Sequence, residues 1–214
     1  FTTASAGTWS SFSLTSGFVV GANTLEFRVT TGKERNGLRV RFHRSVYRCC
    51  ECVEPPADMV LWLPFDETSG PASANLIQGG HDGVQVNGPA VTSGFVANSL
   101  SFNGDDQYVE VPSYAAINFG EGDLSVDAWV TREIRDQGRQ VRIIIDKRAG
   151  QTRGYSFFLG SQGTLGFQLA DGTAENYSSG LAVPSDGQWH HVAVTVERGN
   201  KHGLVFYLDG APEN

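Results

Sequence analysis

The sequence predicts an all-β protein, and two neighbouring runs near its carboxyl end are the clearest evidence. In residues 189–196, His190 and three valines lie on one face of an extended strand. In residues 204–208 the apolar residues again occupy alternate positions, and a polar turn of residues 197–203 joins the two runs. Alternation with a period of two is typical of strands that bury one face. The pair therefore predicts adjacent strands of a curved antiparallel β-sandwich.

The composition agrees with a turn-rich β protein. The 214 residues include 26 glycines, 11% are aromatic and 18% are charged, below the roughly 25% charged residues of average domains. No apolar run approaches the roughly 18 residues of a membrane-spanning helix, so we predict no membrane insertion. The chain begins at Phe1 without a visible signal peptide, and we expect it to be a piece of a longer protein.

Residues 58–214 read as one domain made of a series of strands separated by turns rich in Gly, Asp and Asn. One short turn is expected at residues 114–118, and no amphipathic helix. In chain order, the apolar residues expected to share faces are Leu61, Leu63 and Phe65; Leu100 and Phe102; Val109 and Val111; Leu124, Val126, Ala128 and Val130; Val141, Ile143 and Ile145; Tyr155, Phe157 and Leu159; and Leu165, Phe167 and Leu169.

Residues 1–48 are predicted to form about three strands, too few to close a two-layer core. They read as the C-terminal strands of a separate β-sandwich domain. Residues 1–52 hold seven basic and three acidic side chains, a net +4, and the rest of the chain holds nine and twenty, a net −11. Arg39 and Arg41 alternate with apolar residues, so they lie on one face of a predicted strand. We favour a face that is solvated, or one that pairs with the acidic domain, over a face that binds nucleic acid.

Residues 49–57 are predicted to be a linker, because Pro55 and Pro56 stiffen the chain at a domain boundary. All three cysteines, Cys49, Cys50 and Cys52, lie in it. One disulfide in an oxidising compartment, with the third cysteine paired elsewhere, is favoured over a zinc site or a redox pair. The sequence does not decide which two pair.

Several segments resemble the laminin-G-like, concanavalin A-like jelly rolls of secreted and surface proteins. The resemblance is carried by GQWHHVAVTVERG and GLVFYLDG, and upstream, in family order, by LWLPFDETSG, NSLSFNGDDQYVEVP and GDLSVDAWV. It covers about residues 59–210 and implies an antiparallel jelly-roll β-sandwich that continues past Asn214. Similarly, GFVVGANTLEFRVTTGKERNGLRVRF resembles the last hairpin of a secreted carbohydrate-binding β-sandwich.

The sequence favours no catalytic site. Jelly-roll glycanases place carboxylates along one strand as Glu-x-Asp-x-x-Glu, and this spacing is missing. His190 and His191 are adjacent, so they point to opposite sides of a strand and cannot ligate one metal ion together. His190 reads as a satisfied core histidine. We therefore predict that the protein is not an enzyme.

Calcium is the one cofactor that the sequence suggests. Asn103, Asp105 and Asp106 form the densest acidic turn, and Asp146 opens a second loop. Carboxylate and carbonyl oxygens in such turns are the ligands that Ca²⁺ prefers. The alternative is that Asp and Asn occur there because they form turns well.

Carbohydrate binding requires an aromatic face and amide or carboxylate groups. Trp129 alternates out of the apolar face of its strand, and Asn176 and Tyr177 lie in a predicted loop rich in polar groups, residues 171–179. These three are the candidate ligand-binding residues. The alternative is that the tryptophan seals an edge of the sandwich. Asn176 also opens a glycosylation sequon.

Together these features predict a non-catalytic binding or adhesion module of a larger extracellular or cell-surface protein, with a bacterial source expected. Its partner would be a glycan or an extracellular protein. Two alternatives stay open: a structural subunit of a surface layer or filament that self-assembles by strand exchange, and an accessory domain of a glycan-active enzyme.

Overall fold

The structure is a computed structural model that describes residues 55–132, 141–150 and 152–213. The chain divides into residues 1–53 and 54–214, and the account below concerns the second unit. The strands predicted for residues 1–48, and Cys49, Cys50 and Cys52, lie outside the described residues. In the described part, no helix is long and apolar enough to cross a membrane.

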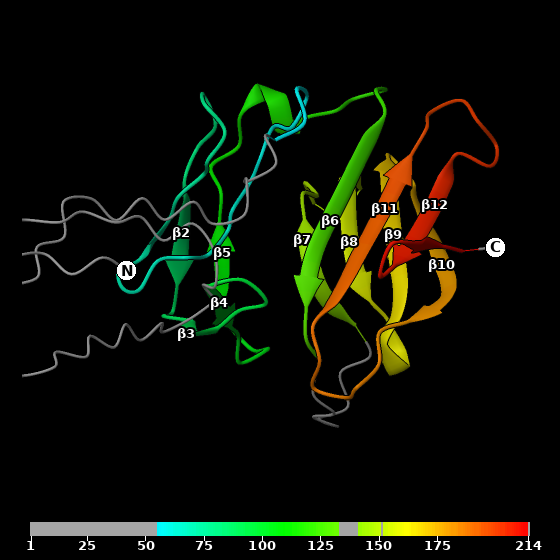
Figure 1. Ribbon diagram of the computed structural model, residues 1–214. Helices are drawn as coiled ribbons and strands as arrows, with labels where there is room; N and C mark the ends of the chain where they lie inside the picture. The colour runs from blue at the N-terminus through cyan, green and yellow to red at the C-terminus, as the bar shows by residue number, and fades with distance from the viewer. Residues whose placement is uncertain (1–54, 133–140, 151, 214) are drawn as a thin grey trace, which may run out of the picture. The chain divides into compact units, whose positions relative to one another are not determined.

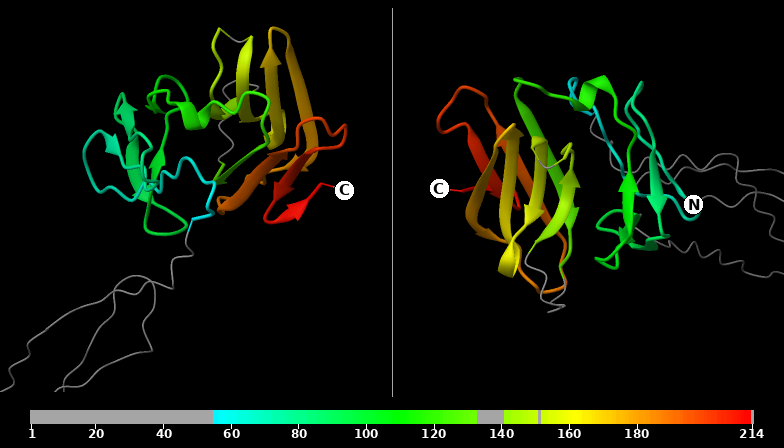
Figure 2. Two further views of the ribbon diagram at one scale, coloured as in Figure 1. Left: turned by 90° about the horizontal axis from the view of Figure 1, so that it is seen from above. Right: turned by 180° about the vertical axis from the view of Figure 1, so that it is seen from behind.

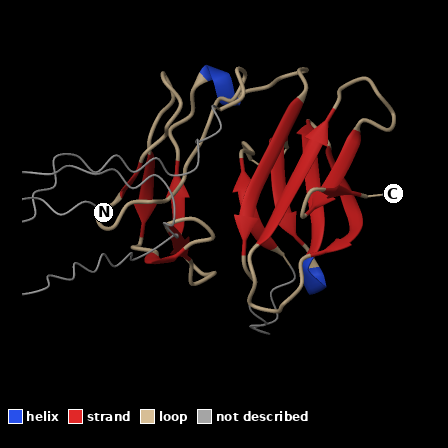
Figure 3. Ribbon diagram, viewed as in Figure 1, coloured by secondary structure: helices blue, strands red, loops and turns tan. Residues whose placement is uncertain are grey.

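The predicted all-β sandwich is confirmed (Figures 1 and 3). Two four-stranded antiparallel sheets form its layers, and Figure 2 shows them from above and from behind. The first, the meander sheet, has the order β10-β9-β8-β7, with strands β7 (Arg142–Asp146), β8 (Arg153–Leu159), β9 (Thr164–Asp171) and β10 (Ala174–Ala182). The second, the β6 sheet, has the order β13-β12-β11-β6, with strands β6 (Leu124–Val130), β11 (His190–Val196), β12 (Leu204–Leu208) and β13 (Ala211–Pro212).

The core lies between these sheets, because both sheets turn the apolar residues of their alternating pattern inward. The fully buried residues include Phe157, Leu165 and Phe167 of the meander sheet and Val192 and Val194 of the β6 sheet. The complete cluster is Leu124, Val126, Phe157, Leu159, Leu165, Phe167, Val183, Val192, Val194, Val196 and Phe206. The predicted pair of strands at residues 189–196 and 204–208 is confirmed, since β11 and β12 are paired antiparallel from Val192↔Leu208 to Val196↔Leu204.

Residues 72–110 form two smaller sheets, in which the buried residues are small or polar, such as Ser73, Gln85 and Ser99. One has the order β1-β2-β5, with β1 (Ala72–Ser73), β2 (Gly83–Val86) and β5 (Tyr108–Glu110). The other pairs β3 (Ala90–Ser93) with β4 (Asn98–Ser101). Two 3₁₀ turns, η1 (Ala115–Ile117) and η2 (Ser161–Gly163), complete the described elements; η1 confirms the turn predicted at residues 114–118.

The structure corrects three details of the predicted elements. Most of the loop predicted at residues 171–179 is strand, because β10 pairs with β9 from Ala174↔Ala170 to Ser178↔Gly166 and the ladder satisfies its backbone although the sequence is polar. Residues 61–65 form no strand: Pro64 has no N–H to donate, and Phe65 has a φ of 60°, which an extended ladder does not accommodate. Ile143 and Ile145 do not share a face. A register shift between them sets Ile143 opposite Phe158 and Ile145 opposite Phe157, so a β-bulge turns the two side chains to opposite sides of the sheet.

His190 joins three segments at one end of the β6 sheet. Its Nδ1 lies 2.8 Å from Oδ2 of Asp209, and its Nε2 lies 3.3 Å from Oδ1 of Asp186. Carboxylate oxygens only accept hydrogen bonds, so both bonds form together only when the ring carries a proton on each nitrogen. These bonds raise the pKa of His190 above its usual 6.5. His190 is thus a satisfied histidine, as predicted, but it is only partly buried and lies outside the core cluster.

Candidate functional site

The outer face of the meander sheet carries an ordered set of polar and aromatic side chains. Tyr155, Phe157 and Leu159 of β8 point to the core, and alternation therefore turns Ser156 and Phe158 outward. The strand registers then align the outward residues of all four strands in rows that run across the sheet. Two of these rows are relevant. They lie two residues apart along β8, β9 and β10, and three apart along β7, where the bulge adds a residue.

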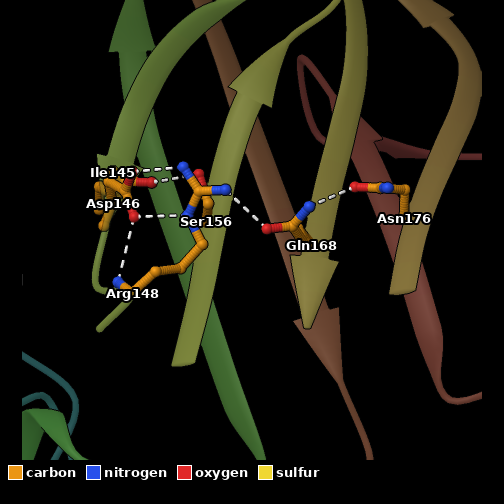
Figure 4. A network of polar contacts seen from close by, with 6 residues as sticks. All are labelled: Ile145, Asp146, Arg148, Ser156, Gln168 and Asn176. Atoms are coloured by element: carbon orange, nitrogen blue, oxygen red, sulfur yellow. Dashed lines mark hydrogen bonds and ion pairs between the residues drawn. The ribbon is translucent and has the colours of Figure 1, made fainter. Parts of the chain in front are cut away.

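The polar row consists of Asp146, Ser156, Gln168 and Asn176, which are cross-strand partners in that order. Figure 4 shows this row with Arg148 lying across it. The Arg148 Nη1 donates to Oε1 of Gln168 at 2.6 Å. The Gln168 Nε2 in turn donates to Oδ1 of Asn176 at 2.7 Å. The bonds run in one direction, and they end at the Asn176 amide nitrogen, which has no partner among the described residues.

Arg148 and Asp146 form a closely fitted ion pair at the start of the row. Nε and Nη2 of Arg148 donate to the two carboxylate oxygens at 2.8 and 2.6 Å, and the Arg148 backbone N–H donates to Oδ1 at 3.1 Å. These bonds to Arg148 lower the pKa of Asp146 and raise the pKa of Arg148. Asp146 therefore stays ionised, and the row begins with a fixed carboxylate whose remaining lone pairs can accept hydrogen bonds.

The apolar row lies beside it and consists of Ile143, Phe158, Gly166 and Ser178. The Phe158 ring covers Gly166, so closely that a Cβ at position 166 would overlap the ring carbons. Glycine is required here because it leaves room for the ring to lie flat on the sheet. Ile143 is 50% exposed, so the row presents apolar surface to solvent next to the polar row.

This arrangement suits binding better than catalysis. An aromatic ring beside a line of amide, guanidinium and carboxylate groups can stack against an apolar ring face while it bonds the polar rim of the same ligand. Acid–base cleavage of a glycoside requires two carboxyl groups about 5 to 9.5 Å apart, one of them with a raised pKa. The two rows, which lie wholly within the described residues, contain a single carboxylate, and its pKa is lowered.

The predicted ligand-binding residues fall in three different places. Asn176 lies in the polar row. Tyr177, one residue later in β10, points to the opposite face, packs against the core and donates to Oε2 of Glu175. Trp129 lies on the other layer, on the outer face of β6, where it is 46% exposed. Arg148, Gln168 and Phe158 complete the site but were missed, because only the cross-strand register shows which outward residues align.

The predicted calcium ligands are also separated. The Asn103 Oδ1 accepts the backbone N–H groups of Asp105, Asp106 and Gln107, and the Asn103 Nδ2 donates to Asp106. Asp146 is paired with Arg148 instead. Nowhere in the described ranges do three or more His, Cys, Asp or Glu side chains group around a potential metal site. Calcium binding stays a prediction, and at Asp146 it would require the cation to displace Arg148. Melting temperatures in Ca²⁺ and in EDTA test it.

Comparisons with known proteins bear on this domain. A laminin-G model of the concanavalin A-like lectin/glucanases superfamily matches residues 103–214, which confirms the resemblance over that region. One solved structure with similarity is an S-layer domain-containing protein from Clostridium thermocellum, with 22% identity and a TM-score of 0.42. The alignment covers 72% of this chain and 70% of that chain. No curated protein matches the sequence.

Proposed function

Since the chain belongs to the concanavalin A-like lectin/glucanases superfamily, we propose that residues 58–214 form a non-catalytic carbohydrate-binding module of an extracellular or cell-surface protein. The proposal places the ligand on the outer face of the meander sheet. The observation that carries it is the pairing of the polar row with the apolar row across four strands.

The chemistry of the two rows matches that of a sugar. Each sugar ring has apolar C–H faces and a rim of hydroxyl groups that both donate and accept hydrogen bonds. Phe158 and Ile143 supply the apolar surface, Asn176 supplies a donor, and Asp146 supplies acceptors. Strands lie about 4.8 Å apart, so a row of four strands spans about 14 Å, enough to contact more than one sugar ring.

The side chains of the polar row are held in place before a ligand arrives. Arg148 is fixed by Asp146 at one end and bonds Gln168, and Gln168 bonds Asn176. Because these rotamers are ordered in the free protein, less conformational entropy is lost on binding. An accessory domain of a glycan-active enzyme would use the same face, so both roles predict the same binding site.

The test is binding of the full chain to a glycan array, followed by calorimetry with the best oligosaccharide. Gln168→Ala removes the two bonds that hold Arg148 and Asn176 in place and should weaken binding about three- to tenfold. Phe158→Ala removes the apolar surface and should weaken it at least tenfold. Gln188→Ala, in the loop before β11, is the matched control and should change nothing. The proposal fails if no glycan binds, or if the Gln168 and Gln188 variants bind alike.

Incubation of the same oligosaccharide with the protein tests the absence of catalysis. We expect mass spectrometry to recover it intact after a day. Shorter products that disappear in an Asp146→Asn variant would show that the module is an enzyme.

A further inference from the structure

The polar row presents hydrogen-bond donors at its far end, and Arg148 is the reason. A guanidinium group has N–H donors and no acceptor. The Gln168 atom that faces Nη1 of Arg148 at 2.6 Å must therefore be the carbonyl oxygen, and the Gln168 amide nitrogen must face Asn176. The Asn176 atom that meets this nitrogen at 2.7 Å must in turn be a carbonyl oxygen. Both amide orientations thus follow from the donor-only group at the start of the row.

Arg148 is itself held firmly. Asp146 accepts bonds from its Nε, its Nη2 and its backbone N–H, and the Arg148 side chain is 19% exposed. It lies across the row (Figure 4), where Ser156 is fully buried and donates to the carbonyl of Ile145. Because the guanidinium group is fixed, the amide of Gln168 cannot turn round without placing two donors face to face.

The exposed end of the row is the amide nitrogen of Asn176. Asn176 is exposed, and no described residue accepts a hydrogen bond from its Nδ2. The residues beside the two amides are small on both strands: two on the same face of β10, Ala174 and Ser178, and their partners on β9, Ala170 and Gly166. A ligand can therefore reach the Asn176 amide from solvent.

A donor whose orientation is fixed selects for an acceptor in the ligand. A sugar hydroxyl both donates and accepts, so it binds either orientation of an amide. A carbonyl or a carboxylate only accepts, and it gains from a donor that cannot turn away. A carboxylate is disfavoured, because Asp146 already neutralises Arg148 in the row and residues 53–214 carry nine basic and twenty acidic side chains. The neutral carbonyl of an acetamido group is the better match.

The surroundings of Asn176 suit the rest of an acetamido group. The N–H of this group points away from its carbonyl, and Ser178, about 6.8 Å further along the same face of β10, offers a hydroxyl oxygen on that side. The methyl group can lie on the Phe158 ring, which covers Gly166 on the neighbouring strand. Gly166 is the cross-strand partner of Ser178, so the ring and the hydroxyl are adjacent.

We propose that the outer face of the meander sheet selects sugars that carry an acetamido group, and that Arg148 is the positioning residue that sets this preference through Gln168. N-acetylated hexosamines are the sugars of this class. The inference rests on the proposed carbohydrate-binding function, and it adds the class of sugar and the residue that determines it.

The test compares two tetrasaccharides with the same linkage and ring stereochemistry, N-acetylchitotetraose and cellotetraose, in calorimetry with the full chain. They differ at the second carbon of each ring, which carries an acetamido group in the first and a hydroxyl in the second. We expect the first to bind about tenfold more tightly, through one hydrogen bond and the contact of one methyl group. The cellouronic acid tetramer, which carries carboxylates, should bind no better than cellotetraose.

Gln168→Glu is designed to reverse the orientation of Asn176. The new carboxylate accepts from Arg148 as the native carbonyl does, but it also accepts from Asn176, whose amide must then turn its carbonyl oxygen outward. Binding of N-acetylchitotetraose should fall at least tenfold, whereas cellotetraose, whose hydroxyls can donate instead, should change less than about threefold. Both ligands are neutral, so the added charge does not distinguish them. Gln188→Glu, in the loop before β11, is the matched control and should change neither affinity.

Arg148→Gln tests the positioning role directly. A glutamine side chain both donates and accepts, so the amides of Gln168 and Asn176 can turn, and the preference for N-acetylchitotetraose should fall below about threefold while cellotetraose still binds. If this variant does not fold, Gln168→Glu decides alone, because it keeps the bond to Arg148.

The proposal is overturned if N-acetylchitotetraose binds the native chain no more tightly than cellotetraose, or if the folded variants leave the ratio of the two affinities unchanged. The carbohydrate-binding function stands in either case, provided that some glycan of the array binds. If none binds, that function and this inference fail together.

Discussion

The four-stranded sheets and the small sheets of residues 72–110 use similar sequences to different effect. Both contain alternating apolar residues. In the four-stranded sheets, one face of each strand is covered by the opposite layer, and Phe157, Phe167 and Val194 are fully buried. In the small sheets, Val84 is 49% exposed and Tyr108 is 50% exposed. The difference shows that alternation creates an apolar face, but only a second layer turns that face into a core.

The largest expected effect is at the centre of the core. Phe167→Ala removes a ring that is completely buried between the sheets, and both the lost burial and the cavity destabilise the fold. We expect the free energy of unfolding to fall by about 3–5 kcal/mol, measured by urea denaturation followed by circular dichroism. A loss below about 1 kcal/mol would contradict the two-layer core.

A smaller loss is expected where the outer face of the meander sheet is tightly packed. Gly166→Ala forces the Phe158 ring off the sheet, and overpacking of this kind costs about 1–3 kcal/mol. The same denaturation experiment measures it. Adding Phe158→Ala to the variant should recover most of the loss, because the methyl group then has space. If the double variant is no more stable, the contact between ring and glycine is not the cause.

The His190 cluster predicts a dependence of stability on pH. The pKa of His190 is raised by Asp209 and Asp186, so its contribution is complete below pH 6.5 and is lost as the pH rises through the folded-state pKa. The pKa values of both aspartates are lowered from 3.8, so their contribution is lost as the pH falls below that value. We expect this cluster to contribute most between about pH 4 and 6.5, with a small loss of stability on the alkaline side because its carboxylates are exposed to solvent. Melting temperatures from pH 3 to 9 test this, and His190→Gln should remove the alkaline loss.

The smallest effect is expected in the small-sheet region. Phe102→Ala is the same chemical change as Phe167→Ala, but Phe102 lies just after β4 and is 43% exposed. Surface substitutions usually change stability by less than about 0.5 kcal/mol. A loss approaching that of Phe167→Ala would mean that Phe102 is buried in the folded protein in solution, and the contrast between the two regions would disappear.

The sequence alone predicts the sandwich and most of its inward faces, because period-two alternation survives in β6, β8, β9 and β11. It does not predict β10, whose polar sequence AENYSSGLA reads as a loop. It fails where one residue overrides the pattern. Pro64 and Phe65 prevent a strand at residues 61–65, although the apolar residues alternate there. The bulge in β7 separates Ile143 from Ile145, and no residue in that run signals a bulge.

The candidate site was only partly predictable for a different reason. Asn176 was identified because an exposed amide in a polar segment is visible in the sequence. Its alignment with Gln168 and Asp146 depends on the registers of three strand pairs, and the lengths of the connecting loops do not determine them. Trp129 was grouped with Asn176 by chemical type, yet the two residues belong to different sheets.

The order of the strands also has a consequence for how the domain assembles. In the meander sheet every strand pairs with its neighbour in sequence, so each hairpin closes a short loop. β6 instead pairs with β11, with Val130 opposite His190. The four meander strands lie between β6 and β11 in the sequence, so this pairing closes a much longer loop than any hairpin of the meander. Closing the longer loop costs more chain entropy, and such distant pairings form slowly. We therefore expect the meander sheet to form first, and β11 and then β6 to pack against it later. The β6–β11 pairing would then be the slow step of folding.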